Sequence, residues 1–117
     1  MSVILVADDD RAVRRLLCTV LRSAGHKLLE AGNGFEAVAL FRSNPDGIDL
    51  VITDMTMPVM NGAQAIARIR ETRPGVPVIL VTGYADTPAP PGVDVLQKPF
   101  STRALLDLVA RKLGQAV

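Results

Sequence analysis

The sequence predicts an α/β protein in which helices cover both faces of a parallel β-sheet. Short apolar runs without alternating polar residues recur along the chain, as expected for strands that are buried on both faces. Stretches with helical spacing of apolar residues lie between these runs, and glycine, asparagine or proline marks most of the junctions. Strands and helices that alternate through short connections predict a parallel sheet with right-handed crossovers.

The first part of the chain has strand patterns at 3–7 and 27–31. Between them a helix is expected from about 11 to 24, because apolar residues recur at helical spacing: Val13, Leu17, Leu21 and Ala24. Gly25 then acts as a stop signal for this helix. After the turn Asn33-Gly34, a second helix is expected to run as far as the sequence Asn-Pro-Asp-Gly and to carry Phe35, Val38 and Phe41 on one face.

The second part of the chain continues the alternation, with strands expected at about 49–53, 77–81 and 93–97. A helix from about 62 to 72 is expected to bury one apolar face, at Ile66 and Ile69. The last helix, from about 101 to 113, places its apolar residues at helical spacing: Leu105, Val109 and Leu113.

The segment 83–92 interrupts this alternation. Its ten residues include three prolines and two glycines. A proline inside a helix costs about 3 kcal/mol, so a regular helix is disfavoured there. We expect a loop with at most one helical turn, which leaves the fold with a shortened or missing fourth helix.

Five strands of this kind fit a flavodoxin-like three-layer sandwich with the strand order 2-1-3-4-5. In that order the topological switch point lies between the first and third strands, and ligands bind at the carboxyl ends of the strands there. Asp8 and Asp9 follow the first strand, and Asp54 follows the third. The topology therefore predicts a site at this edge of the sheet.

The composition indicates one domain, residues 1–117, with a largely aliphatic core, because 49% of the residues are hydrophobic and only 3% are aromatic. The formal net charge of +1 gives no electrostatic reason to expect nucleic acid or an anionic membrane as a partner. Cys18 is the only cysteine, and no apolar run approaches the ~20 residues of a membrane span. Aspartates interrupt the N-terminal segment by residue 10, unlike a signal peptide. We therefore expect a small soluble cytoplasmic protein.

Residues with metal-binding and phosphate-binding side chains follow four of the five strands. Two more groups join the three aspartates at the strand ends, the hydroxyl of Thr82 and the ammonium of Lys98. The candidate metal ligands are all oxygens, which favours Mg²⁺ or Mn²⁺ over zinc. Asp54 is the expected phosphoryl acceptor because it stands alone after the central strand, with Thr82 and Lys98 binding phosphoryl oxygens.

Each of these residues, taken alone, also fits an ordinary structural role. Asp10 is expected to cap the next helix, and for Asp8 and Asp9 alone capping or solvation is as good an interpretation as metal binding. In the same way, Asp54 would be a turn residue, Thr82 the end of a strand and Lys98 a partner in a salt bridge. Three arginines of the first helix are expected on a solvated face: Arg11, Arg14 and Arg15. The joint placement at four strand ends makes coincidence a poor explanation.

Four segments of the chain together resemble the receiver domain of two-component response regulators: VILVADDD, DLVITDMTMPVMNG, VILVTGYAD and QKPF. The resemblance covers essentially the whole chain. It implies that Asp54 accepts a phosphoryl group from a phosphohistidine, with Mg²⁺ bound by Asp9 and Asp54. It also implies that Asp8 acts through a water, that the backbone carbonyl of Thr56 completes the ligands, and that Thr82 and Lys98 are the signalling hydroxyl and phosphate-binding lysine. Lys98-Pro99 matches the family's cis-peptide position.

Two departures from the family pattern concern the switch. The aromatic residue usual three positions before the lysine is replaced by Val95, and the proline-rich segment 83–92 replaces most of the family's fourth helix. Tyr84, two residues after Thr82, is expected at the mouth of the site, where its ring would hinder the water that hydrolyses the acyl-phosphate. Phosphorylation is therefore expected to shift the population of the loop without moving a rigid helix.

The resemblance implies a phosphorylatable signalling module that assists its own phosphorylation and dephosphorylation but is otherwise not an enzyme. The implied partners are a histidine kinase or histidine phosphotransfer protein and a downstream protein target, for a monomer or weak dimer that is either a single-domain regulator or a receiver of a hybrid kinase. Two alternatives are a Mg²⁺-dependent aspartate-nucleophile phosphatase and a non-phosphorylated pseudo-receiver. The phosphatase is disfavoured because Thr56 stands where its second catalytic aspartate would be.

Overall fold

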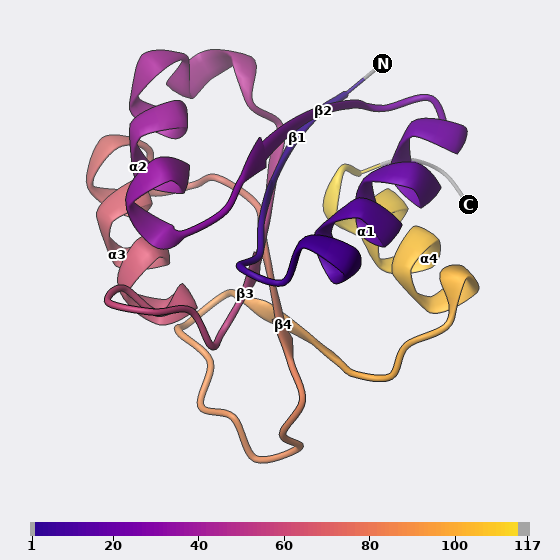
Figure 1. Ribbon diagram of the computed structural model, residues 1–117. Coiled ribbons are helices and arrows are strands. Elements are labelled where there is room, and N and C mark those ends of the chain that lie inside the picture. Colours follow the sequence, from indigo (N-terminus) through magenta and orange to yellow (C-terminus); the bar gives the residue numbers. More distant parts are fainter. Residues whose placement is uncertain (1, 115–117) are drawn as a thin grey trace.

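The computed structural model describes residues 2–114 and contains a five-stranded parallel sheet (Figure 1). The strands are β1 (Val3–Ala7), β2 (Lys27–Ala31), β3 (Leu50–Asp54), β4 (Val78–Thr82) and β5 (Asp94–Gln97). Their order is β2-β1-β3-β4-β5, and every neighbouring pair is parallel. The predicted order is therefore confirmed, and β1 and β3 are neighbours at the switch point.

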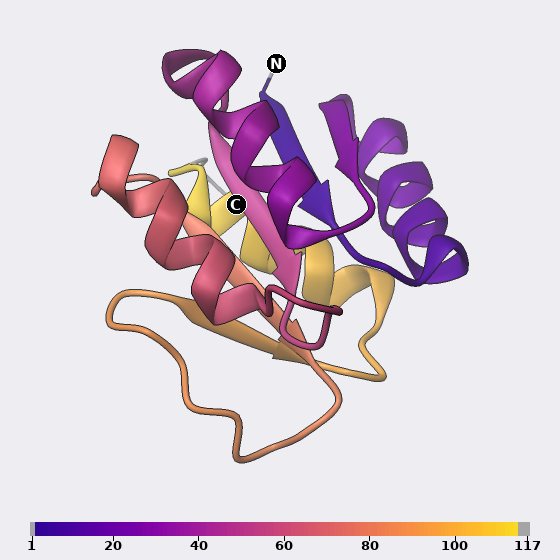
Figure 2. The same cartoon turned by 60° about the vertical axis from the view of Figure 1, so that its left-hand side comes forward.

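Four α-helices pack on the two faces of the sheet, namely α1 (Arg11–Ser23), α2 (Gly34–Ser43), α3 (Gly62–Thr72) and α4 (Thr102–Lys112). A short 3₁₀ turn, Pro45–Gly47, follows α2. Figures 1 and 2 show α2 and α3 together on one face and α1 and α4 together on the other. The predicted three-layer arrangement is confirmed. No described helix is long and apolar enough to cross a membrane.

Hydrogen bonds at the N-termini of α1 and α3 hold the loops that connect these helices to the preceding strands. Asp10 caps α1, because its side chain accepts hydrogen bonds from the backbone amides of Ala12 and Val13. Asn61 and Gln64 form a reciprocal capping box at the start of α3. The capping role expected for Asp10 is confirmed, and it separates Asp10 from the two aspartates that precede it.

The core has two halves, one on each face of the sheet, and successive residues of each strand alternate between them. In β1, Leu5 packs on the side of α2 and α3, whereas Ile4 and Val6 pack on the side of α1 and α4. Each such side chain contributes about 1.5–3 kcal/mol when it is fully buried. Phe41 is the only aromatic side chain in the core described, so the core is aliphatic as predicted.

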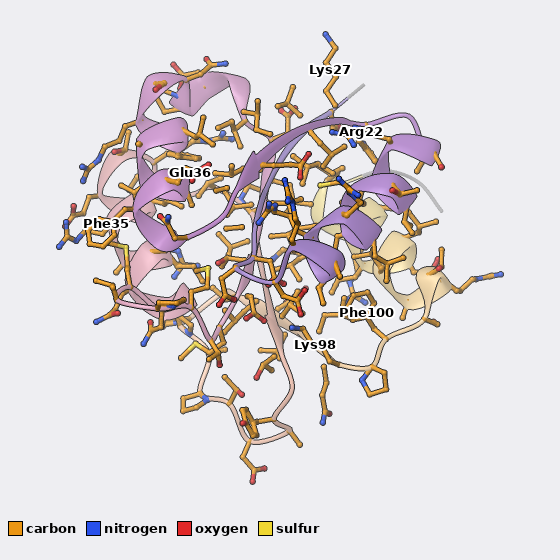
Figure 3. All side chains as sticks on the ribbon, in the orientation of Figure 1. Arg22, Lys27, Phe35, Glu36, Lys98 and Phe100 are labelled. Atoms are coloured by element: carbon orange, nitrogen blue, oxygen red, sulfur yellow. The ribbon has the colours of Figure 1, made fainter. Side chains whose placement is uncertain are left out.

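Phe35 does not share the buried face of Val38 and Phe41, so the prediction of one common face was wrong for this residue. Its side chain is 55% exposed, and Figure 3 shows it on the outer side of α2. The buried stripe of α2 consists instead of Gly34, Ala37, Val38 and Phe41, at positions three, four and seven residues from the first. Phe35 is turned away from this stripe because each residue of a helix advances by about 100°.

The connection between β4 and β5 contains no helix, as predicted for residues 83–92. Two turns shape it, closed by the backbone hydrogen bonds Thr87 N to Tyr84 O at 3.3 Å and Val93 N to Pro90 O at 3.2 Å. Val95 of β5 is aligned with Leu80, which faces the α2 and α3 side. Val95 is nevertheless 39% exposed, because a loop runs where a covering helix would lie.

Candidate functional site

The acidic residues of β1 and β3 come together at the carboxyl edge of the sheet. One carboxylate oxygen from each of Asp8, Asp9 and Asp54 lies within 4.8 Å of the others. Asp8 and Asp54 are buried, and Asp9 is exposed. The register aligns Ala7 with Thr53, so the residues that follow them necessarily meet at the strand ends. Asp54 is itself the last residue of β3, one position further into the strand than the sequence predicts.

The carboxylate of Asp8 is only half satisfied by the protein. Its Oδ1 accepts a hydrogen bond from the Asp10 amide at 2.8 Å, whereas its buried Oδ2 has no hydrogen-bond partner among the described residues. Burial raises the pKa of Asp8 to about 6, and the negative charges of Asp54 and Asp9 add to this effect. The hydrogen bond from Asp10 and the charge of Lys98 oppose the increase.

Lys98 places a positive charge beside these carboxylates (Figure 3). Its Nζ lies 3.0 Å from Asp54 Oδ1 and 3.9 Å from Asp8 Oδ2. Its backbone amide donates to the carbonyl of Thr82 at 2.7 Å, and its peptide bond to Pro99 is cis. Burial alone would lower the pKa of the Lys98 ammonium, but its hydrogen bond to Asp54 and the charges of Asp54 and Asp8 raise it above its ordinary value.

Thr82 lies at the same edge, but its hydroxyl is engaged with the loop that follows. The residue is buried as the last position of β4. Its Oγ1 accepts a hydrogen bond from the Tyr84 amide at 3.1 Å and lies 2.7 Å from Thr87 Oγ1. The side chain of Tyr84 points away from the core and is 72% exposed.

The loop between β3 and α3 returns at Gly62 to the backbone at the end of β3. Its closure depends on Gly62, whose amide donates to Met55 O at 2.8 Å. A Cβ atom at Gly62 would collide with the backbone oxygen of Asp54, so only glycine fits without a shift. Within the loop, Met57 and Met60 are buried and Thr56 is exposed. The loop thus holds the backbone of Thr56 two residues beyond Asp54.

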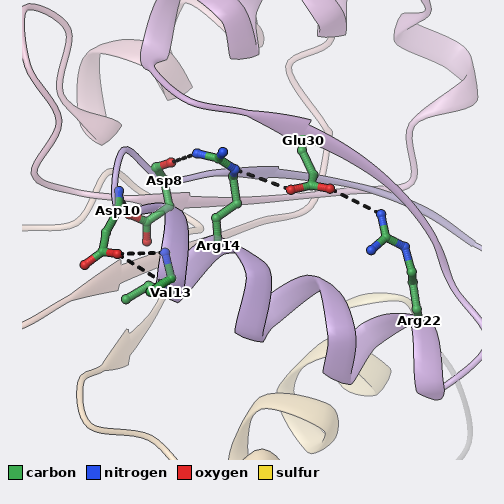
Figure 4. A network of polar contacts seen from close by, with 7 residues as sticks. Asp8, Asp10, Val13, Arg14, Arg22 and Glu30 are labelled. Carbon is green, nitrogen blue, oxygen red and sulfur yellow. Dashed lines mark hydrogen bonds and ion pairs between the residues drawn. The ribbon is translucent and has the colours of Figure 1, made fainter.

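Arg14 connects the acidic edge to the outer strand β2 (Figure 4). Its Nη1 donates to the backbone oxygen of Asp8 at 2.7 Å, and its Nε lies 3.4 Å from Glu30, which also contacts Arg22 at 3.2 Å. The expectation of a solvated face was wrong for Arg14, because its side chain is only 18% exposed. The spacing of residues along a helix could not predict this contact, because the partner of Arg14 is the backbone carbonyl of Asp8, outside the helix.

The structure therefore brings together Asp8, Asp9, Asp54 and Lys98, as predicted, and adds Thr87, Gly62 and Arg14 to their surroundings. The residues present fit a divalent cation that prefers oxygen, because one buried carboxylate oxygen has no partner and three carboxylates converge. A cation there would relieve repulsion, and the adjacent ammonium would bind an incoming anionic group.

A comparison with family models matches residues 4–110 to the response regulator receiver domain. Among curated relatives, the response regulator protein FleR of Pseudomonas aeruginosa is 38% identical over 96% of this chain, and the response regulator receiver protein CpdR of Brucella abortus is 34% identical over 97%. The transcriptional regulator NtrC of Azospirillum brasilense is 40% identical over 97%. The chain spans 98% of CpdR but only about a quarter of FleR and NtrC.

Solved structures show the same similarity. A receiver domain protein from Clostridium thermocellum superimposes with a TM-score of 0.91 at 28% identity, covering 97% of this chain and 95% of its own. The receiver domain of the hybrid histidine kinase CckA gives a TM-score of 0.86 at 33% identity, covering 96% of this chain and 99% of its own. Both structures therefore share this fold over nearly the whole of each chain.

Proposed function

Because this chain belongs to the response regulator receiver domains of two-component systems, we propose that Asp54 is the residue that accepts the phosphoryl group. The observation that carries the proposal is the environment of Asp54. Its carboxylate is buried at the end of the central strand, with Lys98 Nζ at 3.0 Å and the carboxylates of Asp8 and Asp9 beside it. Asp10, in contrast, is occupied as a helix cap.

In the proposed reaction, a carboxylate oxygen of Asp54 attacks the phosphorus of a phosphohistidine. The new P–O bond forms as the P–N bond breaks, and the imidazole nitrogen leaves with the electron pair and regains a proton. Lys98 binds a phosphoryl oxygen in place of the Asp54 carboxylate oxygen that it now contacts. The Thr82 hydroxyl donates to another phosphoryl oxygen once it has turned from the loop.

The metal ligands of the proposal are Asp8, Asp9, Asp54 and the backbone carbonyl of Thr56, with Asp8 acting through a water. When bound, Mg²⁺ supplies charge neutralisation for the carboxylates and the phosphoryl oxygens. Mn²⁺ suits the same oxygen ligands. In this proposal Asp8 Oδ2, which has no hydrogen-bond partner among the described residues, would accept a hydrogen bond from a water bound to the cation.

We propose further that the exposed ring of Tyr84 shields the acyl-phosphate from water, so the chain controls its own dephosphorylation without acting on a separate substrate. Val95 cannot take part in an aromatic switch, because its side chain is aliphatic. The proposed partners are a histidine kinase or histidine phosphotransfer protein as donor and a downstream protein as target, in the cytoplasm. No nucleic-acid contact is proposed for this chain.

The test is labelling with a small phosphodonor such as acetyl phosphate in the presence of Mg²⁺. Asp54→Asn should abolish formation of the acid-stable, base-labile acyl-phosphate while leaving the fold intact by circular dichroism. Asp46→Asn is the matched control, because Asp46 is an exposed aspartate in the 3₁₀ turn and should label like the unaltered protein. Undiminished labelling of Asp54→Asn would contradict the assignment.

A further inference from the structure

The hydroxyl of Thr82 belongs to a small ring of hydrogen bonds with the loop after β4. The Tyr84 amide donates to Thr82 Oγ1 at 3.1 Å, Thr82 Oγ1 and Thr87 Oγ1 lie 2.7 Å apart, and Thr87 Oγ1 donates to the Tyr84 carbonyl at 2.9 Å. The ring thus starts and ends on the two backbone groups of Tyr84. Neither the family motif nor the sequence pattern identifies Thr87, which is five residues from Thr82 in an irregular segment.

Counting protons fixes the direction of the bond between the two threonines. Each hydroxyl has one proton to donate. Thr87 donates its proton to the Tyr84 carbonyl, so the proton between the two hydroxyls must come from Thr82. Thr82 in turn accepts from the Tyr84 amide. In this state Thr82 has no proton left for any other acceptor.

We propose that Thr87 is a positioning residue that holds the Thr82 hydroxyl on the loop and must release it before Thr82 can donate to a phosphoryl oxygen. This inference rests on the proposed phosphorylation of Asp54. The two arrangements are mutually exclusive, because both require the same proton. Thr87 therefore sets how readily the loop responds to phosphorylation.

The difference in burial between the two threonines favours this exchange. Thr82 is buried, so its hydroxyl needs a partner within the protein in either arrangement. Thr87 is only partly buried, so water can replace Thr82 as its hydrogen-bond partner at little cost. A phosphoryl oxygen is charged and is a stronger acceptor than a neutral hydroxyl. The unphosphorylated state consequently favours the ring, and a phosphoryl group on Asp54 competes with it.

Release of Thr82 also weakens the connection between the end of β4 and the loop. When its Oγ1 turns away, Tyr84 N–H and Thr87 Oγ1 lose a partner together. Two contacts between these residues remain, both to the Tyr84 carbonyl: one from Thr87 Oγ1 at 2.9 Å and one from Thr87 N at 3.3 Å. By linkage, any change that weakens the ring should strengthen phosphate binding by the same factor.

The test compares Thr87→Val, which keeps the shape of the side chain but removes its hydroxyl, with Thr87→Ser, which keeps the hydroxyl. The affinity for beryllofluoride in the presence of Mg²⁺ is measured by calorimetry, and the melting temperature is measured without ligand. Thr87→Val should bind beryllofluoride about fivefold more tightly and melt at a lower temperature, because it removes two hydrogen bonds and the one to Thr82 exists only in the resting state. Thr87→Ser should resemble the unaltered protein in both measurements.

A purely structural role for Thr87 would lower the melting temperature without any gain in affinity, and that result would overturn the proposal. An equal gain in Thr87→Ser would also overturn it. As a second measurement in the unaltered protein, hydrogen exchange at the Tyr84 amide should accelerate about fivefold on beryllofluoride binding, and an unchanged rate would overturn the release step. If beryllofluoride fails to bind the unaltered protein, the phosphorylation of Asp54 is wrong, a result distinct from these.

Discussion

Lys98 reaches across the end of β4 to contact Asp54, because β4 lies between β5, which precedes Lys98, and β3, which ends in Asp54. The 3.0 Å contact between Nζ and Oδ1 therefore joins two strands that share no backbone hydrogen bonds. Among the ion pairs of the described residues, Lys98 is the only positive side chain that contacts the carboxylates of Asp8 and Asp54.

Removal of this charge should destabilise the protein and impair phosphorylation. Lys98→Met leaves the buried carboxylate of Asp54 without its charged partner, at an expected cost of about 2 kcal/mol in the free energy of unfolding. Labelling by acetyl phosphate should fall strongly in the same variant. Lys27→Met is the control, because Lys27 is the exposed first residue of β2. This variant should change neither the free energy of unfolding nor the labelling. Normal labelling of Lys98→Met would remove the lysine from the mechanism.

The raised pKa of Asp8 predicts a pH dependence for the metal-free protein. Between pH 4 and 6 the folded state holds a proton on Asp8 that the unfolded state has lost, since the pKa rises from 3.8 to about 6. Stability should therefore decrease as the pH rises through this window, by about 3 kcal/mol from this group alone. Asp8→Asn removes the effect and should be more stable than the unaltered protein at pH 7. Urea denaturation of both proteins at pH 4 and pH 7 checks this prediction. If Asp8→Asn and the unaltered protein differ in stability by the same amount at both pH values, the prediction is contradicted.

Mg²⁺ should stabilise the folded protein, because it relieves repulsion among Asp8, Asp9 and Asp54. At a free concentration ten times the dissociation constant, the gain is about 1.4 kcal/mol, or an increase of about 3–6 °C in melting temperature. Asp9→Asn should lose most of this increase, whereas the control Asp46→Asn should keep it. An unchanged melting temperature of the unaltered protein at millimolar Mg²⁺ would show that these carboxylates do not form a metal site.

Gly62→Ala should destabilise the protein by about 1–3 kcal/mol, because the new Cβ would collide with the backbone oxygen of Asp54 and with Leu80. The shift needed to relieve the collision would displace Asp54, so labelling should also fall. Gly75→Ala is the control, since nothing lies within 4 Å of a Cβ there. Thermal melting of the two variants separates the collision from the general effect of replacing a glycine.

Tyr84→Ala should speed the spontaneous loss of phosphate, because the exposed ring no longer hinders water at the mouth of the site. Tyr84→Phe keeps the ring and should keep the lifetime. The measurement follows the decay of labelled protein after the phosphodonor is removed. Equal lifetimes of the alanine variant and the unaltered protein would exclude Tyr84 from control of dephosphorylation.

The strand ends were predictable because strand periodicity and residue type act over a few neighbouring positions. The run before Asp8 and the run before Asp54 identify two buried strands, and the switch-point rule then places both aspartates at one edge. The contact of Lys98 with Asp54 follows from the same rule. Boundary errors of one residue arise because Asp54 and Thr82 still pair within the sheet although their side chains are polar.

Three features could not be predicted because they depend on tertiary contacts. Phe35 is apolar in a helix, but the buried stripe is decided by the close approach of Gly34 to Met60. Arg14 is mostly withdrawn from solvent because it donates to the backbone carbonyl of Asp8, just after β1. The hydrogen bond between Thr87 and Thr82 depends on the conformation of an irregular loop, which no periodic sequence pattern predicts.

The lack of a helix between β4 and β5 has a consequence for temperature. Most residues of 83–92 are exposed, and a loop of this kind buries little apolar surface against the sheet. Its opening consequently changes the heat capacity very little, because that change scales with the apolar area exposed to water. The enthalpy of loop opening should therefore stay nearly constant over the temperatures at which the sheet itself remains folded, so that the logarithm of the equilibrium constant between closed and open loop varies linearly with inverse temperature.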